Sequence, residues 1–149
     1  MLSVQIRGRV AIELLERRNE RLSELLTHIP VNTPLVDLEP DELGDDWPVR
    51  AAYRELMNID GVGETTATKL LARKRPHLVP ILDSVVTREL SVVNGQYWRP
   101  LHDWLRADDR AQHGRLMRIR DAAGVGSDIS VLRLFDVLAW MVGGNHVTP

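Results

Sequence analysis

The sequence predicts an all-α protein, a single compact bundle of about seven helices over residues 1–149. Apolar residues recur at helical spacing along most of the chain. No stretch of convincing length alternates apolar and polar residues as a half-buried strand would. Glycine and proline residues divide the pattern into helices of ordinary length, and 149 residues suit one domain with a core of ordinary size.

Composition and charge narrow the classes of function. The formal net charge is −2, so any binding to nucleic acid must depend on a local basic patch. The absence of cysteine excludes disulfides and thiolate catalysis, and the five histidines lack regular ligand spacing, so we expect neither a metal nor a cofactor. The chain shows no apolar run long enough to span a membrane and no signal peptide, which predicts a cytoplasmic protein without a membrane partner.

The first expected element is one long amphipathic helix from Val4 to Ile29, which Pro30 and Pro34 end. From Val31 to Asp46 we expect a solvated loop, because proline and glycine interrupt it and its charges are all acidic. Its six carboxylates belong to Asp37, Glu39, Asp41, Glu42, Asp45 and Asp46.

Two helices joined by a tight turn follow, and the sequence predicts a helix-hairpin-helix over residues 49–75. Pro48 suits the first turn of the first helix. Gly61 and Gly63 flank Val62, a pattern that allows a sharp turn with positive φ while one apolar side chain holds the turn to the core. The buried stripe of the first helix is expected to be Val49, Ala52, Tyr53, Leu56 and Met57. The second helix should run from about Glu64 to Arg75.

A short apolar linker, His77 to Leu82, leads to a helix from Ser84 to about Val93, with Asp83 or Ser84 as its N-cap. Asn94 and Gly95 should form a turn. Two further helices are expected at Tyr97 to Leu105 and at Asp109 to Ala123.

The last expected helix is capped by Ser127 or Asp128, and it is apolar nearly all round from Ile129 to Val142. That pattern predicts the most buried helix of the bundle, with Arg133 and Asp136 at one wetter edge, paired to each other or to neighbours. Before it, Gly124, Val125 and Gly126 loosely repeat the earlier glycine pattern, which raises a second, degenerate hairpin as an alternative to the helix cap that we favour.

The turn and the start of the helix after it have the chemistry of a phosphate site. Main-chain N–H groups of a Gly-x-Gly turn and of a helix N-terminus point the same way, and glycine lets a phosphate approach closely. Such a site would contact the backbone of duplex DNA without reading its sequence. Its residues are expected to be Gly61, Val62, Gly63, Thr65, Thr66, Lys69 and Arg73. Glu64, an acid in the same turn, opposes this interpretation.

The same stretch resembles the helix-hairpin-helix motif of DNA-repair proteins, which it matches at Ile59, Gly61, Val62, Gly63, Thr66, Ala67, Leu70 and Leu71. Over about residues 56–90 it is similar to the core of helix-hairpin-helix base-excision DNA glycosylases. The resemblance places Asp83 where that family carries an aspartate, which stabilises the cationic sugar as a base leaves or activates the nucleophile. Thr65 stands where bifunctional members carry lysine, so no lyase activity is expected.

Three functions therefore remain open. We favour a non-sequence-specific DNA-binding domain that resembles a degenerate glycosylase core, in which Asp83 is a structural N-cap. The second is a monofunctional DNA glycosylase that uses Asp83 to assist water. The third is a protein-interaction module, a regulator or antitoxin-like protein with a purely structural hairpin, which the acidic loop and the net charge favour.

Overall fold

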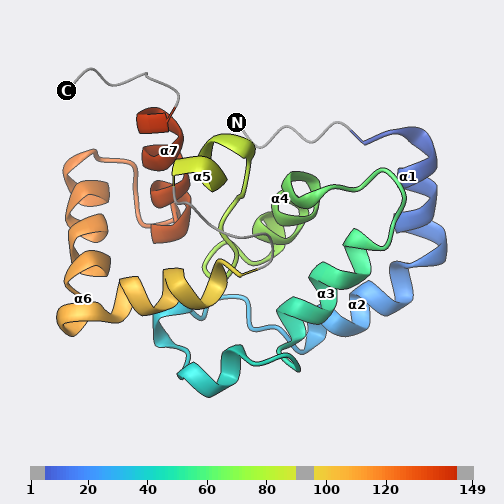
Figure 1. The fold of residues 1–149 in the computed structure, drawn as a ribbon, viewed down its shortest axis with the longest axis horizontal. Helices are drawn as coiled ribbons and strands as arrows, with labels where there is room; N and C mark the ends of the chain where they lie inside the picture. Colours follow the sequence, from blue (N-terminus) through green and yellow to red (C-terminus); the bar gives the residue numbers. More distant parts are fainter. Residues whose placement is uncertain (1–5, 90–95, 144–149) are drawn as a thin grey trace.

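Seven α-helices and no strand are present in residues 6–89 and 96–143, the residues that the computed structural model describes (Figure 1). The prediction of an all-α protein is confirmed. In chain order the helices are α1 (Gly8–Ile12), α2 (Asn19–Thr27), α3 (Pro48–Met57), α4 (Glu64–Lys74), α5 (Ser84–Glu89), α6 (Trp98–Ala122) and α7 (Val131–Gly143).

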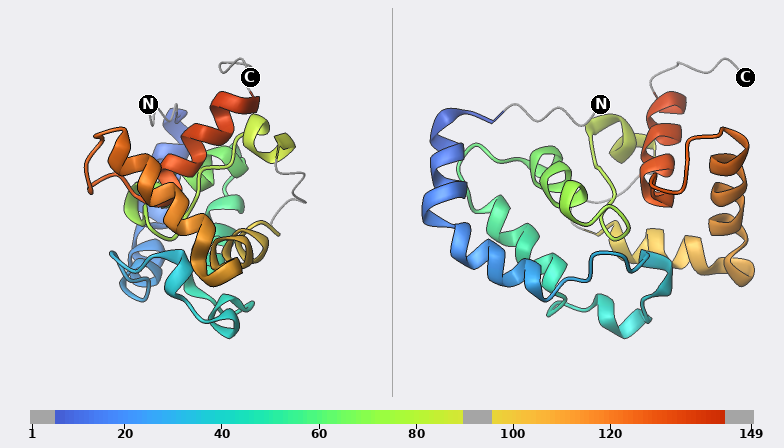
Figure 2. Two further views of the ribbon diagram at one scale, coloured as in Figure 1. Left: turned by 90° about the vertical axis from the view of Figure 1, so that its left-hand side faces the viewer. Right: turned by 180° about the vertical axis from the view of Figure 1, so that it is seen from behind.

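The helices form two groups with α4 between them. At one end α2 packs against α3, and α3 packs against α4 (Figure 1). At the other end α5 and α6 both pack against α7. The view from behind in Figure 2 shows the same order, with α1 and the second half of α6 at opposite ends of the molecule.

The N-terminal helix is interrupted, so the prediction of one continuous helix is wrong. α1 runs directly into a π-helical turn, Glu13–Arg17, and Arg18, at φ −112° and ψ −3°, lies between this turn and α2. A π turn holds more residues than an α turn and rotates the side chains that follow it. Leu15, within the π turn, is 72% exposed. The side chain of Arg18 contacts Glu55 of α3, with 2.5 Å between Nη1 and Oε1.

The segment predicted to be a solvated loop belongs to the core instead. Leu35–Asp37 and Pro40–Leu43 form short 3-10 turns. Four apolar side chains of the segment are buried, namely Leu35, Val36, Leu38 and Leu43, whereas Val31 at its start is 54% exposed. They recur with neither a helical nor a strand period, which is why periodicity gave no sign of their burial.

The acidic side chains of this segment are partly neutralised by arginines of α3 and α6. The ion pairs are Asp37–Arg110 at 2.5 Å, Glu39–Arg106 at 3.4 Å and Asp45–Arg54 at 3.2 Å. Among the described residues, no group of three or more His, Asp or Glu side chains is arranged to hold a metal ion. The acidic segment thus links α3 to α6.

An aromatic cluster joins this segment to α3 and α6. Trp98, the first residue of α6, is 1% exposed. The rings of Trp47, Tyr53 and Tyr97 lie around it, with centroids 5.6, 5.4 and 4.3 Å from its own. The guanidinium of Arg50 lies 5.7 Å from the Trp98 ring. Trp98 is among the largest fully buried side chains, so the core is centred here.

Helix α6 bends sharply, and its two halves correspond to the two helices that the sequence predicts. Asp108, Asp109 and Arg110 have φ values of 50°, 54° and 63°, in the left-handed region. The halves therefore run in different directions (Figure 1). The predicted end of the preceding helix near Val93 and the turn at Asn94 and Gly95 lie outside the described residues.

Helix α7 is not the most buried helix, which corrects the prediction. Its buried side chains are Leu132, Leu134, Phe135 and Asp136, whereas Val137, Trp140 and Val142 are 39%, 44% and 61% exposed. It lies at the edge of the bundle and contacts α5 and α6 (Figure 1). No helix in the described part of the chain has both the length and the apolar character that crossing a bilayer needs.

The N-cap of α7 also differs from the prediction. The N–H of Arg133 donates to Ser130 Oγ at 3.1 Å, so Ser130 caps the helix rather than Ser127 or Asp128. Asp136 is 5% exposed and accepts a hydrogen bond from the N–H of Ile81. It therefore lies in the interior, not at a wetter edge.

Candidate functional site

The connection between α3 and α4 is a tight turn over residues 58–63. Ile59 and Val62 are 3% and 6% exposed and hold the turn to the core. The N–H of Val62 donates to Ile59 O at 2.9 Å. Gly61 has φ 91°, where a side chain would be strained, and a Cβ there would lie 3.4 Å from Val10 of α1. Met57, predicted to be buried, is 39% exposed.

Helix α4 begins with unpaired amides. The N–H of Ala67 donates to Gly63 O, and Gly63, the N-cap, makes no side-chain cap. The N–H groups of Glu64, Thr65 and Thr66 therefore have no acceptor among the described residues, as is general for the start of an uncapped helix. Nothing lies within 4 Å of the position that a Cβ on Gly63 would take, so the approach to these amides is open.

The carboxylate of Glu64 is directed back toward α3. It accepts a hydrogen bond from the hydroxyl of Tyr53 at 3.2 Å. Burial, and then the charge of Glu64, raise the pKa of Tyr53 to about 12, so the hydroxyl stays a donor at neutral pH. The carboxylate of Glu64, which was expected to repel phosphate, is thus hydrogen-bonded across the contact between α3 and α4.

The basic side chains of α4 have different surroundings. Lys69 is half-buried, Arg73 is exposed, and both lie on one face, four residues apart. Arg75 instead donates from Nε to Ile29 O at 2.7 Å and from a terminal nitrogen to Leu26 O. Arg75 therefore satisfies carbonyls at the end of α2, and it does not contribute to a free basic surface.

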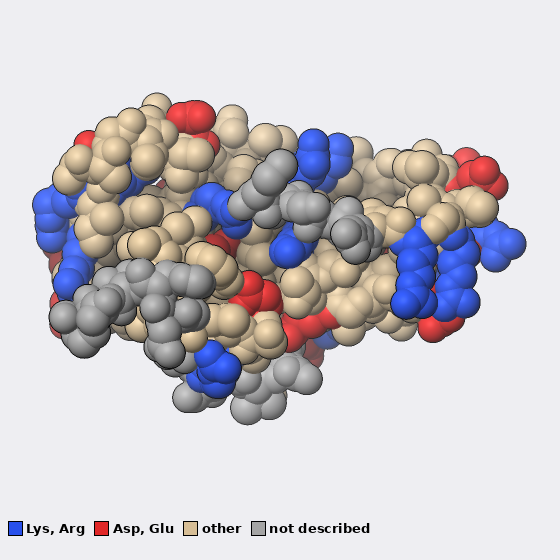
Figure 3. Space-filling view, turned by 90° about the horizontal axis from the view of Figure 1, so that it is seen from above, with Lys and Arg blue, Asp and Glu red and all other residues tan. Residues whose placement is uncertain are grey.

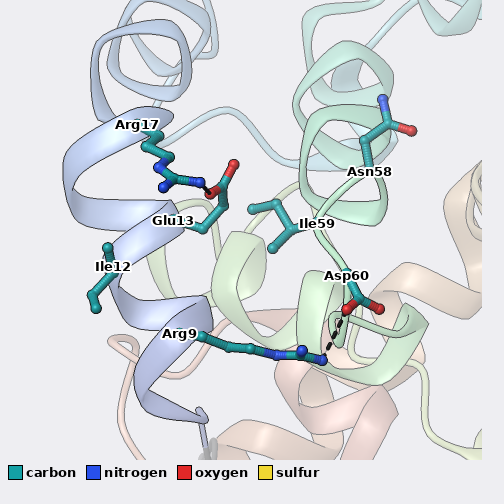
Figure 4. Close-up of a pocket in the computed structure, with 7 residues that line it drawn as sticks. All are labelled: Arg9, Ile12, Glu13, Arg17, Asn58, Ile59 and Asp60. Carbon is teal, nitrogen blue, oxygen red and sulfur yellow. Dashed lines mark hydrogen bonds and ion pairs between the residues drawn. The ribbon is translucent and has the colours of Figure 1, made fainter.

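A pocket of about 450 Å³ lies between α1, the π turn and the α3–α4 connection. In Figure 4, Arg9 extends from α1 across this pocket to Asp60, and 2.8 Å separate Nη2 from Oδ2. Both side chains are exposed, at 63% and 87%. A cation from α1 thus lies beside the turn, and an acid of the turn neutralises it. Sequence reasoning missed Arg9 because it lies 52 positions before Gly61.

Surface charge on the upper face of the molecule is mixed (Figure 3). Seen from above in Figure 3, basic side chains form separate groups between acidic and uncharged ones rather than one continuous basic surface. Any attraction for a polyanion is therefore local, as the net charge of −2 predicts.

Asp83 caps the N-terminus of α5. Of the two roles considered for this residue, a structural N-cap and a catalytic carboxylate, the first requires this geometry. Its Oδ1 accepts hydrogen bonds from the N–H groups of Val85 and Val86, at 3.0 and 2.9 Å. The linker before it is buried and fixed from two sides. The N–H of Leu82 donates to Thr68 Oγ1 at 3.2 Å, and that of Ile81 donates to Asp136 Oδ2 at 2.9 Å.

A second pocket opens beside Asp83. It has a volume of about 380 Å³, which falls within the roughly 300–1,000 Å³ typical of small-molecule sites. It is lined by Lys69, Ile81, Asp83, Val86, Arg133, Asp136, Val137 and Trp140. Lys69 thus belongs both to the hairpin surface and to this pocket.

Helix α7 supplies three polar or aromatic pocket residues that sequence reasoning did not assign to a site: Arg133, Asp136 and Trp140. Burial raises the pKa of Asp136 well above its usual value, although the Ile81 amide and Arg133 oppose this shift. The other carboxyl oxygen, Oδ1, is buried without a hydrogen-bond partner. For the α7 wall of this pocket, the sequence signal was a charged residue, Asp136, within an otherwise apolar stretch.

Comparison with known proteins yields one match. The family model described as "Family of unknown function (DUF6308)" matches residues 1–143. No curated protein and no solved structure matches the chain.

Proposed function

The chain belongs to the DUF6308 family of unknown function, and from the geometry of its α3–α4 turn we propose that it is a non-sequence-specific DNA-binding domain. The observation that carries this proposal is the set of three unpaired amides at the start of α4, which stand beside the open side of Gly63. Donors of this kind bind phosphate because they are already oriented and because the helix dipole favours an anion there.

The side chains around these amides suit the backbone of duplex DNA. Lys69 and Arg73 follow on one face of α4, and Thr65 and Thr66 add hydroxyls in its first turn. Phosphate contacts position a protein on DNA but carry no sequence information. Nothing in this set is placed to read the edges of bases, so we propose binding without sequence preference.

Binding to duplex DNA is expected to be weak and sensitive to salt. If the site engages two to four phosphates, a plot of log K against log[salt] should have a slope of roughly −2 to −4. Arg73→Ala should weaken binding because it removes a positive charge. Asp60→Asn should strengthen binding, because it removes a carboxylate that repels phosphate and frees Arg9 from its ion pair with Asp60. Fluorescence anisotropy with a labelled duplex at several salt concentrations measures all three effects.

Two matched controls separate the proposed site from general charge. Arg115→Ala removes an exposed arginine from the half of α6 at the far end of the molecule, and it should leave binding unchanged (Figure 1). Gly63→Ala places a methyl group beside the unpaired amides and should weaken binding, whereas Gly8→Ala, also in open space, should not. Salt-independent affinity, or no binding at low salt, would rule out DNA binding and favour the protein-interaction module.

The pocket beside Asp83 favours a second candidate, a monofunctional DNA glycosylase. Asp83 lies in the wall of a cavity that adjoins the hairpin through Lys69. In base excision the bond between the sugar and the base breaks, the base leaves with the electron pair, and water adds to the sugar as it loses a proton. A carboxylate such as Asp83 would stabilise the cationic sugar. Enzymes that act on a base also need a pocket to receive it.

Asp83→Asn separates the two candidates. The amide oxygen can still cap α5, so the substitution should cost about 1 kcal/mol or less of stability. For a binding domain we expect no base release by the parent from uracil-containing, oxidised or alkylated duplexes, and an unchanged DNA affinity in Asp83→Asn. Base release in single-turnover assays that disappears in Asp83→Asn would instead establish the glycosylase.

A further inference from the structure

A carboxyl group in the wall of the pocket between α4, α5 and α7 has one oxygen without a hydrogen-bond partner among the described residues. Asp136 is 5% exposed and lines the pocket. Its Oδ2 accepts the N–H of Ile81 at 2.9 Å, whereas its Oδ1 is buried without a partner. Leaving a buried polar atom unpaired has a cost in stability, because the atom has lost its hydrogen bonds to water. A group bound in the pocket would remove that cost by pairing with Oδ1.

Asp136 has the properties of a neutral carboxylic acid. Burial favours its uncharged form, and Asp83 nearby adds to the effect, while the Ile81 amide and Arg133 act against it. The charged groups that line the pocket with it are Lys69 of α4, Asp83 before α5 and Arg133 of α7, and α6 contributes none. A neutral carboxyl can accept the Ile81 N–H with one oxygen and donate a hydrogen bond into the pocket with the other.

Two cations of the pocket make no ion pair with a carboxylate of the described residues, although the charge of Arg133 opposes the rise in the pKa of Asp136. Lys69 and Arg133 are half-buried, and within residues 6–89 and 96–143 neither side chain makes an ion pair or a hydrogen bond. A partly desolvated cation without a partner is expected to attract an anion. The pocket therefore suits a ligand that carries a negative group.

The remaining wall of the pocket is aromatic and aliphatic. Trp140 is 44% exposed, and Val137 and Val86 line the pocket beside it. Indole rings bind planar heterocycles, nucleobases among them, by stacking. These three features of the pocket suit a ligand that has a planar ring, hydrogen-bond acceptors on the edge of that ring and an anionic group.

We propose that this pocket binds a nucleotide, with the base against Trp140, a base acceptor at Asp136 Oδ1, and the phosphate at Lys69 and Arg133. The proposal does not require the α3–α4 turn to bind DNA. A free mononucleotide and an unpaired nucleotide in a strand share this chemistry, so the experiment must include both.

The test is isothermal titration of the intact protein with the four nucleoside monophosphates, with the matching nucleosides and with a short single-stranded oligonucleotide. Nucleotides should bind and nucleosides should bind more weakly, since they lack the group for Lys69 and Arg133. Trp140→Ala should weaken binding about tenfold or more, whereas Trp104→Ala, which removes a 41% exposed tryptophan outside the pocket, should not. Binding of the oligonucleotide alone would identify a strand as the source of the ligand.

Asp136→Asn tests the role of the neutral acid. Asparagine keeps an acceptor for Ile81 and a donor for the ligand, so this variant should fold and bind at every pH. In the parent, Asp136 loses its proton as the pH rises through its raised pKa, so binding should weaken with increasing pH relative to Asp136→Asn. The ratio of the two affinities at each pH cancels titration of the ligand.

Several results would overturn the proposal. The first is that no nucleotide or oligonucleotide binds at millimolar concentration. The second is that Trp140→Ala and Trp104→Ala lose the same nucleotide affinity. The third is that the ratio of the affinities of the parent and Asp136→Asn does not change between pH 5 and 9. Arg73→Ala and Gly63→Ala distinguish this pocket from the DNA site, because both should leave mononucleotide affinity unchanged. Failure of duplex binding alone would refute the DNA proposal and not this one.

Discussion

Trp98→Ala should be the most damaging single substitution in the chain. The side chain is 1% exposed and contacts three other aromatic rings, one directly before α3, one in α3 and one directly before α6. Removing a buried tryptophan costs about 3–5 kcal/mol, because the transfer free energy is lost and the surrounding rings cannot fill the cavity. That is a large part of the roughly 5–15 kcal/mol that stabilises a domain.

Thermal unfolding followed by circular dichroism measures this loss. The midpoint should fall by roughly 10–20 °C for a domain of this size. Trp104→Ala is the matched control, since this residue is 41% exposed and has one ring contact, with Phe135 at 5.7 Å. If the two variants lose the same stability, the core is not centred on Trp98.

The helix ends and turns that the sequence predicted well are each specified by a residue at or beside that position in the chain. Pro48 lies in the first turn of α3, Gly61 takes the positive φ that its turn requires, and Asp83 caps α5. Each of these signals acts within a few residues. Local chemistry is therefore enough to place helix ends and turns.

The features that the sequence did not predict depend on contacts between distant residues. Asp136 lines a pocket with Asp83 and Lys69, which precede it by more than fifty positions. Arg9 reaches the hairpin from α1 in the same way. The periodicity of the sequence cannot show which distant side chains meet, because those contacts depend on how the helices pack. Of the candidate site, the sequence indicated the tight turn between α3 and α4 and the capping residue Asp83, and it missed the α7 wall of the pocket.

Helix α7 shows the limit of reading burial from an apolar pattern. An all-round apolar helix predicts burial only if enough other elements surround it, and here the described neighbours of α7 are α5 and α6. Its exposed face instead contributes Trp140 and Val137 to the pocket. The apolar residues of α7 are therefore divided between the buried face, which includes Leu132 and Phe135, and the wall of the pocket.

Phe135→Ala tests this account of α7. Phe135 is 8% exposed and packs against Trp104, so its loss should cost about 3 kcal/mol, at the lower end of the range for a buried aromatic residue. Val137→Ala, two residues along the same helix at 39% exposure, should change the free energy of unfolding by no more than about 0.5 kcal/mol, as substitutions at exposed sites generally do.

Urea denaturation of Phe135→Ala, Val137→Ala and Trp98→Ala gives the order of the stability losses. The expected order is Trp98, then Phe135, then Val137, because the aromatic cluster lies at the centre and α7 at the edge. A loss at Phe135 that exceeds the loss at Trp98 would restore α7 as the central helix.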